Sequence, residues 1–113
     1  MLRETFEPVY AVMINEDEGN ICELKITPDD IYRLLKGTAT FIGQWPEIDV
    51  VILKCDVSPF DLMENRNVLP PPFHQESVRG PILLMRMDED AMPADFRLTE
   101  YRLWRGTMIC PRV

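Results

Sequence analysis

The sequence lacks most of the patterns that disclose a protein's chemistry. Its three cysteines, Cys22, Cys55 and Cys110, are an odd number without a Cys-x-x-Cys spacing, so neither a zinc site nor a disulfide framework is predicted. Its five glycines are scattered, and no glycine-rich phosphate loop is present. The only histidine is His74, so an imidazole base would have to be this residue. We therefore expect no cofactor, and we predict free cysteines buried in strands, with Cys110 the most exposed.

Positive charge is also scarce. Twelve Lys and Arg residues stand against 19 Asp and Glu residues, and the net charge of −7 disfavours binding to nucleic-acid phosphates or to an anionic membrane. No stretch approaches the ~18 consecutive apolar residues of a membrane span. Residues 1–7 carry charges where a signal peptide needs an apolar core. We expect a cytoplasmic protein, or one packaged from the cytoplasm, that binds neither nucleic acid nor membranes.

The sequence does contain several short apolar runs of β type. Its 113 residues, 46% of them hydrophobic, predict one domain over residues 1–113. The longest apolar run, within 80–88, predicts a strand buried on both faces. The run within 49–55 predicts a second such strand beside it at the centre of the sheet. Residues 9–14 and 21–26 flank a polar loop and predict a hairpin.

Helical signals are fewer, and ten prolines disfavour a mostly helical fold. Thr-Pro-Asp-Asp at 27–30 supplies a cap, a first-turn proline and two acids for the helix dipole, which predicts the main helix over 28–36. A similar Ser-Pro pattern predicts a short helical turn over 58–64. Residues 95–104 fit a helix or a strand, and we favour a strand that passes into a helical turn ended by Gly106. The fold class is α+β, with a mixed, mostly antiparallel sheet of five to seven strands.

A long connection over 65–79 is the candidate interaction site. Three consecutive prolines favour polyproline II, which an adaptor would present to the aromatic groove of a partner module. Phe73 stands where a Pro-Pro-x-Tyr motif needs tyrosine, so the alternative is a stiffened loop whose Phe73 packs on the core. The candidate interaction residues are Leu69, Pro70, Pro71, Pro72, Phe73, His74 and Trp104.

A small enzyme or a metal-dependent protein is a further alternative, in which His74 acts with nearby carboxylates. The acidic clusters at 16–18 and 88–90 would share a divalent cation if they lay at the same end of the sheet. Neither cluster keeps the spacing of a calcium loop. Acids that solubilise turns are the simpler interpretation of both clusters.

The favoured function is a non-enzymatic interaction or structural protein that acts as a homodimer. One short helix is too small to cover a face of the predicted sheet, and an exposed apolar face is a common reason to dimerise. Charge is uneven as well: residues 1–30 hold eight acids, whereas 97–113 hold four arginines. An acidic edge of one copy would then meet the basic tail of another.

The order of these runs resembles that of small uncharacterised domain proteins of large DNA viruses, including the marseillevirus-like viruses of amoebae, and of some phages. The residues that carry the resemblance are 10–26, 28–35, 50–55, 67–70 and 80–87. The resemblance implies no activity and no site residues. It implies a virion or accessory protein, located in the cytoplasm of an infected cell or packaged in the virion.

Overall fold

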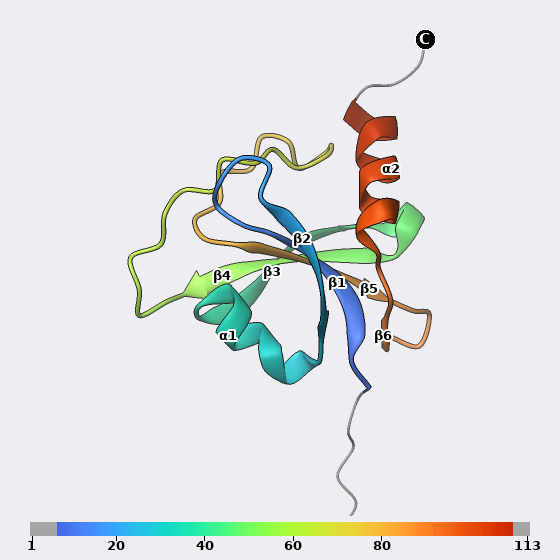
Figure 1. The fold of residues 1–113 in the computed structure, drawn as a ribbon, viewed down its shortest axis with the longest axis horizontal. Helices are drawn as coiled ribbons and strands as arrows, with labels where there is room; N and C mark the ends of the chain where they lie inside the picture. Colours follow the sequence, from blue (N-terminus) through green and yellow to red (C-terminus); the bar gives the residue numbers. More distant parts are fainter. Residues whose placement is uncertain (1–6, 110–113) are drawn as a thin grey trace, which may run out of the picture.

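The computed structural model describes residues 7–109, which form one sheet with a helix on each side (Figure 1). Every neighbouring pair of strands is antiparallel, in the order β2-β1-β5-β4-β3, and β6 pairs with the end of β5. The strands are β1 (Val9–Ile14), β2 (Ile21–Ile26), β3 (Thr38–Trp45), β4 (Val50–Val57), β5 (Ile82–Met87) and β6 (Pro93–Ala94). The helices are α1 (Ile31–Leu35) and α2 (Leu98–Ile109), with 3₁₀ turns at Pro28–Asp30 and Pro46–Ile48.

β5 is the centre of the sheet, as its apolar sequence predicts. Leu84 lies opposite Val12 of β1 on one side and Ile52 of β4 on the other, which confirms the predicted pairing of the two apolar runs. Side chains alternate along a strand, so β5 directs Ile82 and Leu84 to one face and its other apolar residues to the opposite face. All four residues from Ile82 to Met85 are buried. A strand of this kind needs cover on both faces.

The face that α2 covers, here called the α2 face, holds the larger core. Trp45 is its largest buried side chain, and Tyr101 and Trp104 of α2 pack against that indole, with ring centroids 6.5 and 6.2 Å away. The long loop between β4 and β5 adds Leu69 and Val78 to the same cluster. The buried residues of this core are Val12, Ile14, Trp45, Val50, Ile52, Leu69, Val78, Ile82, Leu84, Phe96 and Tyr101.

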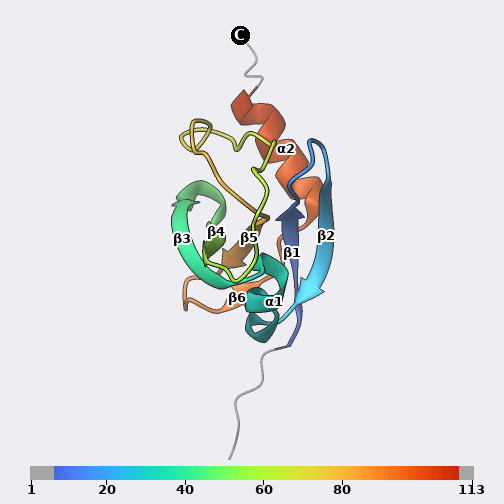
Figure 2. The same ribbon diagram turned by 90° about the vertical axis from the view of Figure 1, so that its left-hand side faces the viewer.

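The opposite face, here called the α1 face, is covered less completely. Figure 2 shows α1 on the side of the sheet away from α2. This helix has only five residues, and Leu35 is the one it buries fully. Leu24, Val51 and Leu53 of the strands are only partly buried beneath it. The buried residues of this second core are Ala11, Met13, Ile26, Leu35, Cys55, Leu83 and Met85.

The predicted helix over 28–36 is present but divided. It starts as a 3₁₀ turn and becomes α-helical at Ile31. The predicted cap is confirmed in part, because Asp30 Oδ2 accepts a hydrogen bond from the Thr27 amide at 2.9 Å. Lys36, at φ 64°, ends the helix in the left-handed region, a role that the sequence had assigned to Gly37. Gly37 serves close packing instead, as described below.

The prediction of a helical turn over 58–64 is wrong. Ser58 Oγ donates to the Lys36 carbonyl and accepts from the Phe60 amide, which holds the chain in a bend. Beyond it, Glu64 forms an isolated antiparallel bridge with Arg79, and the Gly80 amide donates to the Met63 carbonyl at 2.7 Å. The backbone groups of this segment are therefore used by residues 78–80 rather than by a helix of its own.

The preference for a strand within 95–104 is also wrong. Residues from Leu98 form α2, which continues through Gly106 to Ile109. The Leu98 amide donates to Glu23 Oε2 at 2.8 Å, so a carboxylate of β2 satisfies a free N–H at the start of the helix. Arg97 pairs with both oxygens of Glu23 at 2.9 Å. Local sequence patterns cannot predict a cap that comes from a strand distant in sequence.

The cysteines follow their positions in the sheet. Cys55 of β4 is buried, as predicted, whereas Cys22 of the edge strand β2 is exposed. Cys22 lies opposite Met13 of β1, which places it on the α1 face. Cys110 lies outside the described residues.

Replacing Gly37 by Ala tests the close approach of the end of α1 to β4. A Cβ at Gly37 would lie 2.2 Å from the Val57 carbonyl oxygen and 2.5 Å from Cys55 Sγ, and the backbone there has little freedom to move. We expect Gly37→Ala to lower the free energy of unfolding by about 1–3 kcal/mol. Gly106→Ala is the control, because a Cβ at Gly106 meets nothing within 4 Å and alanine favours the helix by roughly 0.5–1 kcal/mol. Urea denaturation measures the free energy of unfolding of both variants. Equal changes in the two variants would contradict the close approach of Gly37 to β4.

The pairing of β2 with α2 predicts a pH effect. The Arg97 guanidinium, followed by the Leu98 amide, lowers the pKa of Glu23 below its usual value of 4.5. When folding lowers the pKa of a carboxyl group, the ionised group stabilises the fold at pH values above its unfolded-state pKa. This stabilisation is lost as the pH falls through the lower, folded-state pKa. We expect Glu23→Gln to reduce the thermal midpoint near pH 7, with the difference from wild type shrinking below about pH 4.5. A difference that is constant from pH 7 to pH 3 would contradict this pairing.

Candidate functional site

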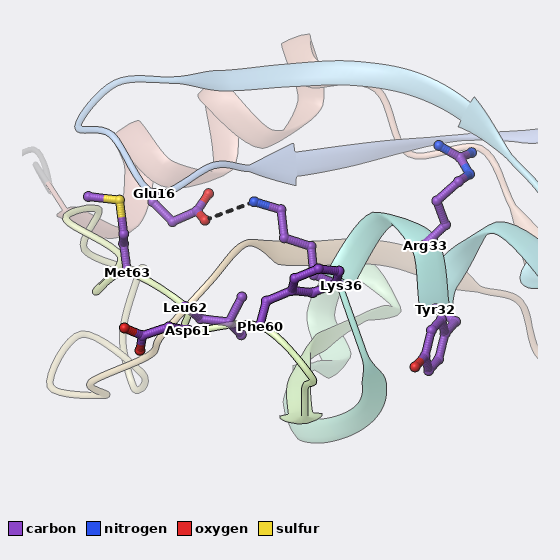
Figure 3. Close-up of a pocket in the computed structure, with 8 residues that line it drawn as sticks. All are labelled: Glu16, Tyr32, Arg33, Lys36, Phe60, Asp61, Leu62 and Met63. Carbon is purple, nitrogen blue, oxygen red and sulfur yellow. Dashed lines mark hydrogen bonds and ion pairs between the residues drawn. The ribbon is translucent and has the colours of Figure 1, made fainter.

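An open groove lies on the α1 face between α1 and the extended segment 60–63. Its volume is about 640 Å³. Figure 3 shows Glu16 and Met63 toward one end of the groove and Tyr32 and Arg33 toward the other. The lining residues are Glu16, Tyr32, Arg33, Lys36, Phe60, Asp61, Leu62 and Met63.

The apolar side chains of the groove are unusually exposed. Tyr32, Phe60 and Met63 have 59%, 64% and 61% of their surface accessible, although each is large and mostly apolar. Phe41 of β3 is also exposed, and its register opposite Leu53 places it on the same face of the sheet. Single exposed apolar residues are normal, but several gathered around one groove indicate a contact surface.

Charged side chains lie at the edges of the groove, beside its apolar side chains. Lys36 Nζ lies 3.4 Å from Glu16 Oε2, and Arg33 Nη2 lies 3.3 Å from Asp30 Oδ1. The Thr27 amide, with a smaller contribution from Arg33, lowers the pKa of Asp30 below its usual value of 3.8. Both cations along α1 are thus paired with carboxylates, whereas Asp61 on the other side of the groove forms no ion pair within residues 7–109.

Asn65 holds the outer wall of the groove to the sheet. It is the only buried polar residue within the described part of the chain. Its side-chain Nδ2 donates to the Ile14 carbonyl at 3.2 Å and to the Gly80 carbonyl at 2.9 Å. Its backbone N–H donates to the Val78 carbonyl at 2.8 Å. These bonds fix the chain just after Met63. In the sequence, Asn65 is the first residue of the predicted connection over 65–79 and is not among the candidate interaction residues.

The proline loop is docked on the core rather than held away from it. Leu69 and Pro70 are buried, and the Pro71 carbonyl accepts a hydrogen bond from Trp45 Nε1 at 3.0 Å. Phe73 packs edge-on against Trp45 at 6.0 Å. The loop therefore takes the form of the alternative interpretation, in which Phe73 packs on the core.

Trp104 joins the same cluster from α2. Its ring contacts that of Trp45, and its indole N–H is buried with no hydrogen-bond acceptor among the described residues. Five of the seven residues predicted from the sequence thus meet around or beside one indole, on the α2 face and away from the groove. Pro72 and His74 remain exposed at the surface of the loop.

The acidic clusters lie far apart. Residues 16–18 follow Ile14, which is opposite Ile82 at the start of β5, whereas residues 88–90 follow the end of β5. They occupy opposite ends of the sheet, so the idea of one cation shared between them is wrong. No group of three or more His, Cys, Asp and Glu side chains suited to a metal gathers within residues 7–109.

The groove residues were missed because the sequence suggested a helical turn where the chain is extended. The sequence signal for them is the apolar content of Phe60, Leu62 and Met63 in a segment without helical or strand periodicity. The lining offers apolar contact area and charges at its rim. That combination suits association with another surface.

Replacing Asn65 tests how the outer wall is anchored. Asn65→Leu leaves the Ile14 and Gly80 carbonyls without their donor, and we expect the free energy of unfolding to fall by about 2–4 kcal/mol. Gln75→Leu is the control, because Gln75 is exposed in the same loop, and its effect should stay within about 0.5 kcal/mol. Chemical denaturation measures both variants. A cost for Asn65→Leu as small as that of the control would show that the anchor is unimportant.

Comparison with known proteins places the chain in a family. A family model described as "Family of unknown function (DUF5880)" matches residues 12–104, from β1 to α2. No curated protein and no solved structure matches the chain. No helix within residues 7–109 has the length and apolar character needed to cross a membrane. Because the match covers most of the chain, this protein belongs to the DUF5880 family.

Proposed function

We propose that the protein is a non-enzymatic interaction protein that acts as a homodimer through the groove on the α1 face. The observation that carries the proposal is the gathering of Tyr32, Phe60 and Met63, each more than half exposed, around one apolar groove. Removing such side chains from water stabilises an association by roughly 25 cal/mol for each Å² buried. The α2 face, by contrast, is filled by a helix and a loop.

The incomplete cover of the α1 face supports the same proposal. Five residues of helix lie over a sheet of six strands, and Val51 and Leu53 remain partly accessible. With Phe41, these residues extend the apolar surface from the groove toward β3. A stable interface buries about 800 Å² on each partner. A groove that continues onto a sheet face offers a larger contact area than the groove alone.

Charge favours a second copy as the occupant. On α1, the Arg33 side chain is 72% exposed while it pairs with Asp30, and on the other side of the groove Asp61 has no ion pair within residues 7–109. In a two-fold arrangement, α1 of one copy lies against residues 60–63 of the other, so Arg33 meets Asp61 twice. These local pairs offset the repulsion between two chains that each carry a net charge of −7.

Placing a charge in the groove should dissociate the dimer. We expect wild-type protein at micromolar concentration to sediment as a dimer, and Phe60→Asp and Met63→Asp to sediment as monomers, because a carboxylate would be buried without a partner. Leu103→Asp is the matched control: Leu103 is 75% exposed, but it is on α2, and its variant should remain dimeric. A monomeric wild type, or dimers in all three variants, would refute the proposal. Circular dichroism confirms that each variant is folded.

A charge exchange tests the two-fold pairing itself. Arg33→Asp and Asp61→Arg should each weaken the dimer, because each places like charges opposite one another. The double variant restores opposite charges and should recover most of the affinity, a coupling that a double-mutant cycle measures. Additive losses in the double variant would mean that Arg33 and Asp61 do not face each other across the axis.

A further inference from the structure

A second cleft, lined by residues other than those of the groove, gathers arginines. It lies between the β1–β2 turn, the chain at 66–68 and the middle of α2, and its volume is about 360 Å³. Arg66, Arg102 and Arg105 line it together with Asn67, Tyr101 and Glu18. The sequence separates Arg66 from the other two by more than 30 positions, and the fold brings them to one site.

Hydrogen bonds fix the wall that carries Arg66. Its amide donates to the Glu16 carbonyl at 2.8 Å. Asn67 Nδ2 donates to the Asn15 and Asp17 carbonyls at 2.7 and 2.9 Å, and Asn67 Oδ1 accepts from the Gly19 amide at 2.9 Å. One asparagine therefore clamps the β1–β2 turn to the chain beside Arg66. The backbone of this wall is held in place without any ligand.

The opposite wall is α2, where Arg102 and Arg105 are three residues apart and lie on one side of the helix. Tyr101 between them and the core is almost fully buried. Burial raises the pKa of the Tyr101 phenol to about 12, while the nearby Arg105 guanidinium acts in the opposite direction. The phenol stays neutral, so it does not neutralise the arginines beside it.

Within residues 7–109, no carboxylate forms an ion pair with these arginines. The ion pairs within residues 7–109 use Arg33, Lys36, Arg86 and Arg97, and none uses an arginine of the cleft. Glu18 also lines the cleft, yet it forms no ion pair with any of the three. Among the residues that line the cleft, three arginines outnumber the single carboxylate of Glu18, although the chain as a whole carries a net charge of −7.

We propose that this cleft binds an acidic segment of a partner protein, one that carries neighbouring carboxylates or a phosphorylated side chain. Guanidinium groups match carboxylates and phosphates through paired hydrogen bonds, and clusters of arginine are a recurrent means of reading acidic and phosphorylated motifs. Because the cleft and the groove use different residues on different faces, this site is independent of the proposed dimer.

A protein segment fits the site better than a nucleic acid. The cleft is small, and the rest of the acidic chain would repel a long polyanion. Tyr101 is buried, so the cleft presents no exposed aromatic ring on which a base would stack.

Fluorescence anisotropy tests the site with the full chain and labelled peptides. The probes are a glycine–glutamate peptide, its glycine–glutamine counterpart, a phosphoserine peptide and a single-stranded DNA of equal charge. We expect the glutamate or phosphoserine peptide to bind, the glutamine peptide to fail, and the DNA to bind more weakly. No binding by either acidic peptide, or tighter binding of the DNA, would overturn the proposal.

Variants assign the binding to the cleft. Arg102→Gln/Arg105→Gln should weaken the acidic peptide by about tenfold or more, since each charge-assisted contact contributes about that factor. Lys25→Gln/Lys54→Gln is the control, because it removes two positive charges outside the cleft. It should lower the affinity for the acidic peptide by less than about threefold, through the change in net charge alone. Equal losses in the two double variants would overturn the proposal. Unchanged thermal midpoints confirm that neither pair disrupts the fold.

Discussion

The constraint on which the structure depends is that β5 is buried on both faces. A strand in this position requires a neighbour on each side and cover above and below, and β1, β4, α2 and α1 meet those requirements in turn. The two faces are not covered alike. Twelve residues of α2 and a long loop fill one face, whereas α1 contributes five residues to the other. The exposed apolar groove is the result of that inequality.

The two surfaces singled out above differ in physical kind. The groove on the α1 face is apolar with a charged rim, and the dimer proposed there would be stabilised by the exclusion of water. The arginine cleft is polar, and its contribution comes from charge that nothing in the described part of the chain neutralises. A protein with one surface of each kind suits a role that brings chains together, with self-association on one face and recognition of an acidic segment on the other.

Local patterns predicted the sheet well and the site poorly. The hairpin, the central pairing of β4 with β5 and the position of the first helix all follow from runs of apolar residues and from one capping motif. The errors at 58–64 and at α2 have a common origin, because in both places groups distant in sequence decide the structure. Residues 78–80 take the hydrogen bonds of the first segment, and Glu23 caps the second. The groove and the arginine cleft depend on these same long-range contacts.

The central claim is that the uncovered α1 face is a contact surface between copies. Hydrogen–deuterium exchange of the wild-type chain, measured over a range of protein concentrations, tests it most directly. The account predicts that amides in 32–36 and 60–63 exchange more slowly as concentration rises, while those in 103–107 of α2 do not change. Exchange that is independent of concentration throughout, or slowed only on α2, would contradict it.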